Sequence, residues 1–235
     1  TCALEARYPD VYTQLQSSGI RVFSRGLEVI VKAMTKTHIS RGSIGLFAFI
    51  VALTIGFFAL SQTASADHAW SNYHWARTAN PFTLQIGDNL SSNWDAYLAT
   101  TVNDWSASSV LDLTIVSGGA LKNVRTCRAT AGRVEACNTK YGNNGWLGIA
   151  SIWAYGDHIT QGTVKMNDTY FNTSTYNSSA WRNLVLCQEV GHTLGLDHQD
   201  ETFNNANLNT CMDYTNSPSS NQHPNAHDYE MLETI

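Results

Sequence analysis

A carboxylate and two imidazoles are closely spaced in the stretch Cys187–Asp200, which reads CQEVGHTLGLDHQD. Glu189 precedes His192 by three residues, and Gly195 and His198 follow. A glycine just after such a segment is typical of a helix end, because glycine adopts the left-handed backbone of a C-cap. The chain can then turn back and bring His198 toward His192. This geometry suits a divalent metal ion held by imidazoles, with Glu189 as the general base for a bound water.

Gln188 lies on the same helix face as His192, since positions four apart are only about 40° apart around the axis. Read from Gln188, the segment resembles H-E-x-x-H-x-x-G-x-x-H, the signature of the metzincin zinc peptidases, which include matrixins and astacins. Glu189, His192, Gly195 and His198 occupy its second, fifth, eighth and eleventh positions. Gln188 occupies the first position, where the family has a histidine ligand.

A second part of the resemblance lies downstream, at Cys211-Met212-Asp213-Tyr214. This tetrapeptide is similar to the Met-turn, which passes beneath the metal in the family. Tyr214 matches the tyrosine that can reach the zinc in the astacin and serralysin branches. The resemblance therefore implies a Zn²⁺ cofactor. The residues that it implies are the metal ligands His192, His198 and Gln188, the catalytic Glu189 and Tyr214, and the structural Gly195 and Met212.

Gln188 leaves three alternatives open, because its amide oxygen is neutral and a weaker donor to zinc than an imidazole. It ligates zinc through that oxygen, or another group takes the place, or the metal is lost. The candidates for a replacement are Tyr214, His223, His227 and a water. His223 and His227 are spaced like a helical metal pair, but Pro224 lies between them and favours a loop that leads into a helix.

The elements that must position these residues follow from the periodicity of the apolar side chains. The predicted strands are 82–86, 111–115, 146–154 and 159–166, of which 146–154 is a continuous apolar run and reads as a central strand. The predicted helices are 92–107, 179–194 and 225–235. The predicted non-regular segments are a turn at 87–89 and a loop or irregular hairpin over 120–145.

The resemblance implies an α+β fold with a twisted mixed β-sheet, two helices, and a small C-terminal lobe that carries the Met-turn and a final helix. In metzincins the edge strand of the sheet binds the substrate by strand addition. Residues 159–166 are expected to be that edge strand.

Composition excludes several classes of protein. The chain has 235 residues, of which 43% are hydrophobic and 14% charged, which is typical of a globular domain rather than a disordered chain. Its formal charge of −5 offers no basic surface for nucleic acid. The serines show no G-x-S-x-G motif, and no glycine-rich phosphate loop is present.

A leader for secretion is predicted over residues 34–66. It begins at Met34, contains Lys36 and Arg41 before a long apolar run, and ends in the small-x-small site Ala64-Ser65-Ala66. The alternative is an uncleaved anchor, but the apolar run is at the short limit for a membrane span. Residues 1–33 are expected to be an upstream extension without function, and 67–235 the mature domain.

Four of the five cysteines lie within 67–235, and an even number in an exported protein suggests two disulfides. Cys127 with Cys137 would close a short loop, and Cys187 with Cys211 would tie the active-site helix to the Met-turn. Free thiols are the alternative.

These observations lead to two hypotheses. The first is a secreted, monomeric zinc endopeptidase that acts on protein or peptide substrates, without stable membrane association. The second is a catalytically inactive secreted binding protein on a metzincin-like scaffold without zinc. The histidines would then be ordinary core residues, and Glu189 a local cap or a solvated charge.

Overall fold

The computed structural model of the chain describes residues 2–7 and 68–235. These residues belong to one compact unit, and a second unit, Asp10–Ser65, lies outside the described residues. The predicted leader at 34–66 and most of the predicted extension at 1–33 therefore also lie outside them.

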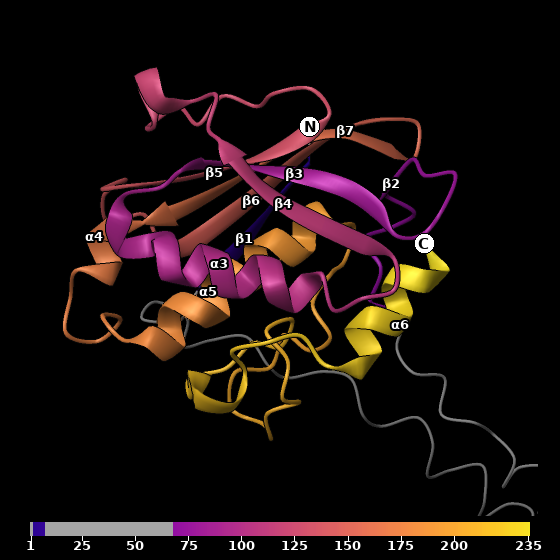
Figure 1. Ribbon diagram of the computed structural model, residues 1–235. Helices are drawn as coiled ribbons and strands as arrows, with labels where there is room; N and C mark the ends of the chain where they lie inside the picture. The colour runs from indigo at the N-terminus through magenta and orange to yellow at the C-terminus, as the bar shows by residue number, and fades with distance from the viewer. Residues whose placement is uncertain (1, 8–67) are drawn as a thin grey trace, which may run out of the picture. The chain divides into compact units, whose positions relative to one another are not determined.

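Seven strands form one mixed, mostly parallel sheet (Figure 1). The strands are β1 (Cys2–Arg7), β2 (His74–Trp75), β3 (Phe82–Asn89), β4 (Leu111–Ser117), β5 (Arg133–Thr139), β6 (Trp146–Tyr155) and β7 (His158–Asn167). Their order is β1-β6-β7-β5-β3-β4, and β2 pairs with β7. Strand β6 is antiparallel to both of its neighbours, whereas the other pairs are parallel.

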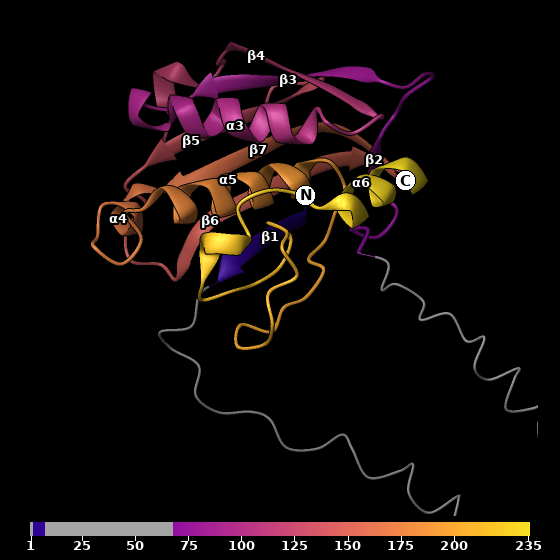
Figure 2. The same cartoon turned by 60° about the horizontal axis from the view of Figure 1, so that its bottom comes forward.

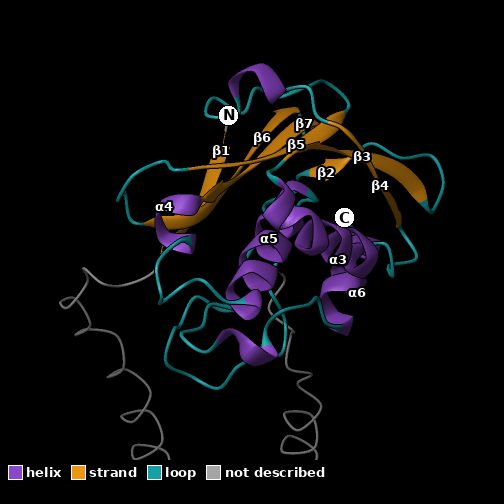
Figure 3. Ribbon diagram, turned by 60° about the vertical axis from the view of Figure 1, so that its left-hand side comes forward, coloured by secondary structure: helices purple, strands orange, loops and turns teal. Residues whose placement is uncertain are grey.

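The longer helices lie together on one side of the sheet, as Figures 2 and 3 show. They are α3 (Asp95–Trp105), α5 (Ser179–Thr193) and α6 (Ala226–Thr234), and the short α4 (Asp168–Phe171) follows β7. Helix α5 packs against β6, β7 and α3, and α3 packs also against β4. Single 3-10 turns occur at Ser92–Trp94, Leu121–Asn123 and Pro218–Ser220.

The three predicted helices and the four predicted strands are present, so the mixed α and β architecture is confirmed. The predicted turn at 87–89 is wrong, because these residues continue β3. All three pair with β5, and Gly87 and Asp88 pair also with β4. The predicted edge strand at 159–166 is also wrong. It is part of β7, which lies between β6 and β5, and most of its residues from Gly162 onward are buried.

The predicted loop over 120–145 contains strand β5. The strand was missed because it carries buried polar residues. Glu135 is fully buried and accepts hydrogen bonds from Asn89 Nδ2 (2.7 Å), Gly119 N (3.0 Å) and Arg133 Nε (2.7 Å). Burial raises the pKa of Glu135, but these bonds and one from Thr130 outweigh it, so the pKa is lower than usual. Since the partners come from three segments, local sequence could not identify the strand.

Both predicted disulfides are present, Cys127–Cys137 and Cys187–Cys211. Helix α6 is capped by Asn225, whose side chain accepts from the backbone of Asp228, while the Asp228 carboxylate accepts from Asn225 N. None of the helices in the described part of the chain combines the length and the hydrophobicity that a membrane span requires.

Candidate metal and catalytic site

Helix α5 and the turn after it position the two histidines. The helix begins after Ser178, whose Oγ accepts from Trp181 N at 3.3 Å, and it ends two residues before Gly195. Gly195 has φ +104°, and a Cβ there would collide with the carbonyl oxygen of Tyr73. Only glycine fits this backbone without strain, so the predicted turn is formed for the expected reason.

The imidazoles of His192 and His198 meet at their Nε2 atoms, which lie 3.0 Å apart. His192 Nδ1 donates to the carbonyl of Leu196 at 2.8 Å, so its Nε2 carries the lone pair, which faces His198. Burial lowers the pKa of His192 to about 4 and holds the pKa of His198 well below its usual range. Both rings are therefore neutral near pH 7, the state in which imidazole binds metals.

The spacing of the two nitrogens fits a shared metal ion. Two ligands at about 2.0–2.1 Å from a tetrahedral zinc lie about 3.3 Å from each other. The observed 3.0 Å between the Nε2 atoms of His192 and His198 is close to this separation. The Nδ1–H···O=C bond of His192 is also the outer contact that commonly orients a ligand histidine.

Two carboxylates lie on the other side of the His198 ring. Asp197 and Glu201 each have an oxygen 3.5 Å from His198 Nδ1. Within residues 2–7 and 68–235, this is the only group of three His, Cys, Asp or Glu side chains with clustered ligand atoms. The Asp197 carboxylate is partly exposed and that of Glu201 largely exposed, and both face Nδ1 of His198 rather than the Nε2 atom that approaches His192.

Glu189 is fully buried between α5 and β6. Its side chain lies against Gly148 of β6, where a Cβ would be 2.6 Å from both Cγ and Oε1 of Glu189. The missing side chain at Gly148 therefore makes room for the carboxylate beside the sheet. Local sequence could not reveal this role of Gly148, because nothing nearby distinguishes it from other strand glycines.

The predicted Met-turn packs directly under the helix. Met212 lies against Gly191 of α5, where a Cβ would be 2.5 Å from the methionine sulfur. Cys211 is bonded to Cys187 of the same helix. Gln199 N donates to Met212 O at 2.7 Å, so the segment after His198 also runs along the turn.

Gln188 is fully buried and belongs to the same helix–turn contact. Its Nε2 donates to the carbonyl of Cys211 at 2.9 Å. Its Oε1 accepts no hydrogen bond from the described residues. The amide nitrogen of Gln188 is thus bonded to the predicted Met-turn, and its oxygen remains a buried acceptor.

The proposed substitutes for a third ligand differ in where they lie. The Tyr214 ring packs on His198, with centroids 4.1 Å apart, and stacks on Phe203. His223 is about half exposed, and its Nδ1 lies 2.7 Å from an oxygen of Asp104 on α3. The ring of His227 contacts that of His68 at 4.8 Å. Of the three, Tyr214 is the one in contact with a site histidine.

His68 is a further buried histidine near the site, which the sequence did not single out. Its Nε2 lies 3.1 Å from the buried carboxylate of Asp228. It is close enough to His192 and His198 to lower the pKa of both, although burial is the main cause there. A single histidine just after a predicted cleavage site carries no spacing signal, so only the fold reveals it.

Comparison with known proteins adds no family assignment: no protein-family model matches the chain, and no curated protein matches it.

Proposed function

We propose that this chain is a zinc-dependent endopeptidase of the metzincin type. The observation that carries the proposal is the 3.0 Å approach of the Nε2 atoms of His192 and His198 in a buried turn. The buried Glu189 lies one helical turn before His192, and Met212 supports the helix from below. This arrangement supports the proposal, in which these residues take the roles that the sequence resemblance implies.

His192 and His198 would hold the zinc, with the buried Oε1 of Gln188 or an outside group as a further ligand. When bound, zinc polarises the scissile carbonyl and lowers the pKa of a water. Glu189 would take a proton from that water and pass it to the leaving amine. Tyr214, packed on His198, would donate a hydrogen bond to the developing oxyanion or complete the metal shell.

The substrate would bind along β6, as an antiparallel strand beside Glu189. In the structure β1 pairs with β6 in this way, and the register places Ala6 opposite Gly148. The outer edge of β6 can therefore accept an extended segment next to the glycine on which Glu189 rests. In a secreted chain that begins at Asp67, this edge would be open to a peptide.

The test combines metal analysis with hydrolysis. We expect the purified protein to contain one zinc and to cleave an unfolded protein substrate. Glu189→Ala should abolish cleavage and keep the zinc and the fold, because it removes the base and no ligand. Glu230→Ala, which removes an exposed carboxylate from α6, is the matched control and should cleave normally. Cleavage that survives Glu189→Ala would refute the proposed mechanism.

A binding protein without catalytic metal is the second candidate, and Gln188 favours it. Its amide is already bonded to Cys211 O, as a purely structural side chain would be. This candidate predicts no zinc in the purified protein and no gain in thermal stability on adding zinc. Gln188→His separates the two: zinc uptake by this variant alone would identify a scaffold that has lost its metal.

A further inference from the structure

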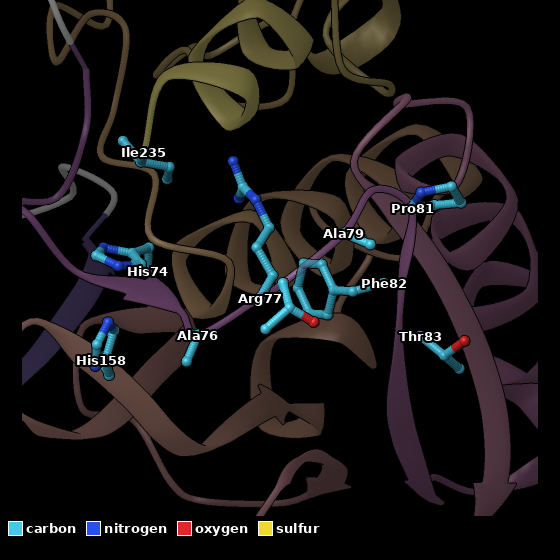
Figure 4. A pocket seen from close by; sticks show the side chains of 10 residues that line it. His74, Ala76, Arg77, Ala79, Pro81, Phe82, Thr83, His158 and Ile235 are labelled. Atoms are coloured by element: carbon cyan, nitrogen blue, oxygen red, sulfur yellow. The ribbon is translucent and has the colours of Figure 1, made fainter.

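A cavity of about 760 Å³ opens between β2, the segment that follows it, the first residues of β3 and β7, and the last residue, Ile235 (Figure 4). This volume lies within the range of small-molecule sites, about 300–1,000 Å³. No residue of the proposed zinc site lines it. The cavity is therefore a separate feature, which the proposed peptidase mechanism does not use.

The ionisable side chains that line this cavity are all basic: His74, Arg77 and His158. No Asp or Glu side chain is among its described lining residues. The chain as a whole has a formal charge of −5, so the charge of the lining side chains is opposite in sign to the net charge of the chain. A basic cavity in an acidic protein favours an anionic ligand and opposes a metal cation.

Arg77 is the side chain best suited to receive an anion. It is half-buried, and one nitrogen, Nη2, donates to the carbonyl of Leu232 at 3.2 Å. That is its only hydrogen bond with the described part of the chain, so the remaining guanidinium donors are available. Figure 4 shows its side chain extending past Phe82 toward the opening between Ile235 and Ala79. A guanidinium held at one nitrogen can bind a carboxylate through the others.

Two imidazoles form the neighbouring wall. His74 and His158 are paired residues of β2 and β7, and their rings meet edge to face with centroids 4.9 Å apart. His74 Nδ1 donates to Asn72 O at 2.8 Å, which fixes the orientation of that ring. The two imidazoles thus form a polar wall next to Arg77.

The rest of the lining is largely apolar. Phe82 is the first residue of β3, Pro81 and Ala79 belong to the segment before it, and Ile235 is the C-cap residue of α6. In Figure 4 the Phe82 ring lies beside the Arg77 side chain. An apolar group attached to a carboxylate would contact these surfaces while the carboxylate reaches the guanidinium.

We propose that this cavity binds a small carboxylate with an apolar body, with Arg77 receiving the carboxylate and Phe82 contacting the apolar part. The probe for the test is 3-phenylpropanoate, titrated into the full chain and followed by NMR. A chelator is present throughout, so that a carboxylate bound to zinc does not contribute. We expect saturable shifts at cavity residues, and binding at least tenfold weaker for the neutral 3-phenylpropanamide.

Arg77→Gln removes the charge and keeps a donor for Leu232 O, so we expect it to weaken binding of the carboxylate at least tenfold and to leave the amide unaffected. Arg125→Gln is the matched control, because Arg125 is exposed and also donates to one backbone carbonyl, that of Lys140. It should bind like the parent. Equal weakening by both variants would point to net charge alone and overturn the site.

A second variant tests the cavity without changing Arg77, so its result does not depend on whether Arg77→Gln folds. Ala79 is exposed at the cavity wall, so Ala79→Trp should fill the space without disturbing the core and should abolish binding of both probes. Retained binding in Ala79→Trp, or no saturable binding by the parent chain, would contradict the proposal. Zinc content and peptide cleavage play no part in these readings, so they are independent of the peptidase proposal.

Discussion

At the scale of residues, the position of the proposed general base, Glu189, depends on its close contact with Gly148. Gly148→Ala would put a methyl group 2.6 Å from Cγ and Oε1 of Glu189 and 2.7 Å from Val185. We expect the carboxylate to move, cleavage to fall at least tenfold, and bound zinc to stay unchanged. The free energy of unfolding should also fall by about 1–3 kcal/mol, from overpacking.

The control for this prediction is Ser151→Ala on the same strand, which shortens a half-buried side chain without touching Glu189. Cleavage and zinc are measured on both variants, together with urea unfolding. Full activity in Gly148→Ala would show that Glu189 does not need its present position.

At the scale of elements, the sheet interior depends on an ionised carboxylate. The pKa of Glu135 is below its ordinary 4.5 because the hydrogen bonds to it outweigh burial. A lowered folded-state pKa contributes stability that is present above the unfolded value and is lost as pH falls through the folded value. We therefore expect unfolding free energy, measured in urea from pH 7 downward, to decrease below about pH 4.5.

Glu135→Gln removes this titration, so its stability should be lower at pH 7 and should lose less as the pH falls. Glu233→Gln, which changes an exposed carboxylate that accepts from Ser109, should keep the full acid dependence. An unchanged pH profile in Glu135→Gln would mean that the buried network does not hold this carboxylate ionised.

At the scale of the whole described unit, Asp228 joins distant segments of the chain. Its buried carboxylate is the partner of His68 Nε2, Gln199 Nε2, Thr210 Oγ1 and Asn225 N. Asp228→Ala would leave the two buried donors, His68 and Thr210, without this acceptor, at about 1–3 kcal/mol each, and would remove it from two partly buried donors as well. We expect thermal unfolding to show a loss of about 3 kcal/mol or more.

Glu233→Ala, an exposed change on the same helix, should cost no more than about 0.5 kcal/mol. A comparable small loss in Asp228→Ala would show that these segments are held by apolar packing rather than by this carboxylate.

The sequence by itself determined the features that depend on local patterns. Helical spacing identified α3, α5 and α6, and alternation identified most of the strands. The even number of cysteines and their positions led to the two disulfides that the structure contains. The glycine at 195 ended the site helix as expected, because a positive φ is a property of one residue type.

Only the tertiary structure decided what depends on partners far away in the chain. It placed β5 in the sheet, because Glu135 is satisfied by residues from other segments. It made β7 an interior strand and put β6 beside Glu189, since strand order is set by pairing and not by sequence order. It also gathered Arg77, Phe82 and Ile235 around one cavity, which no local spacing could indicate.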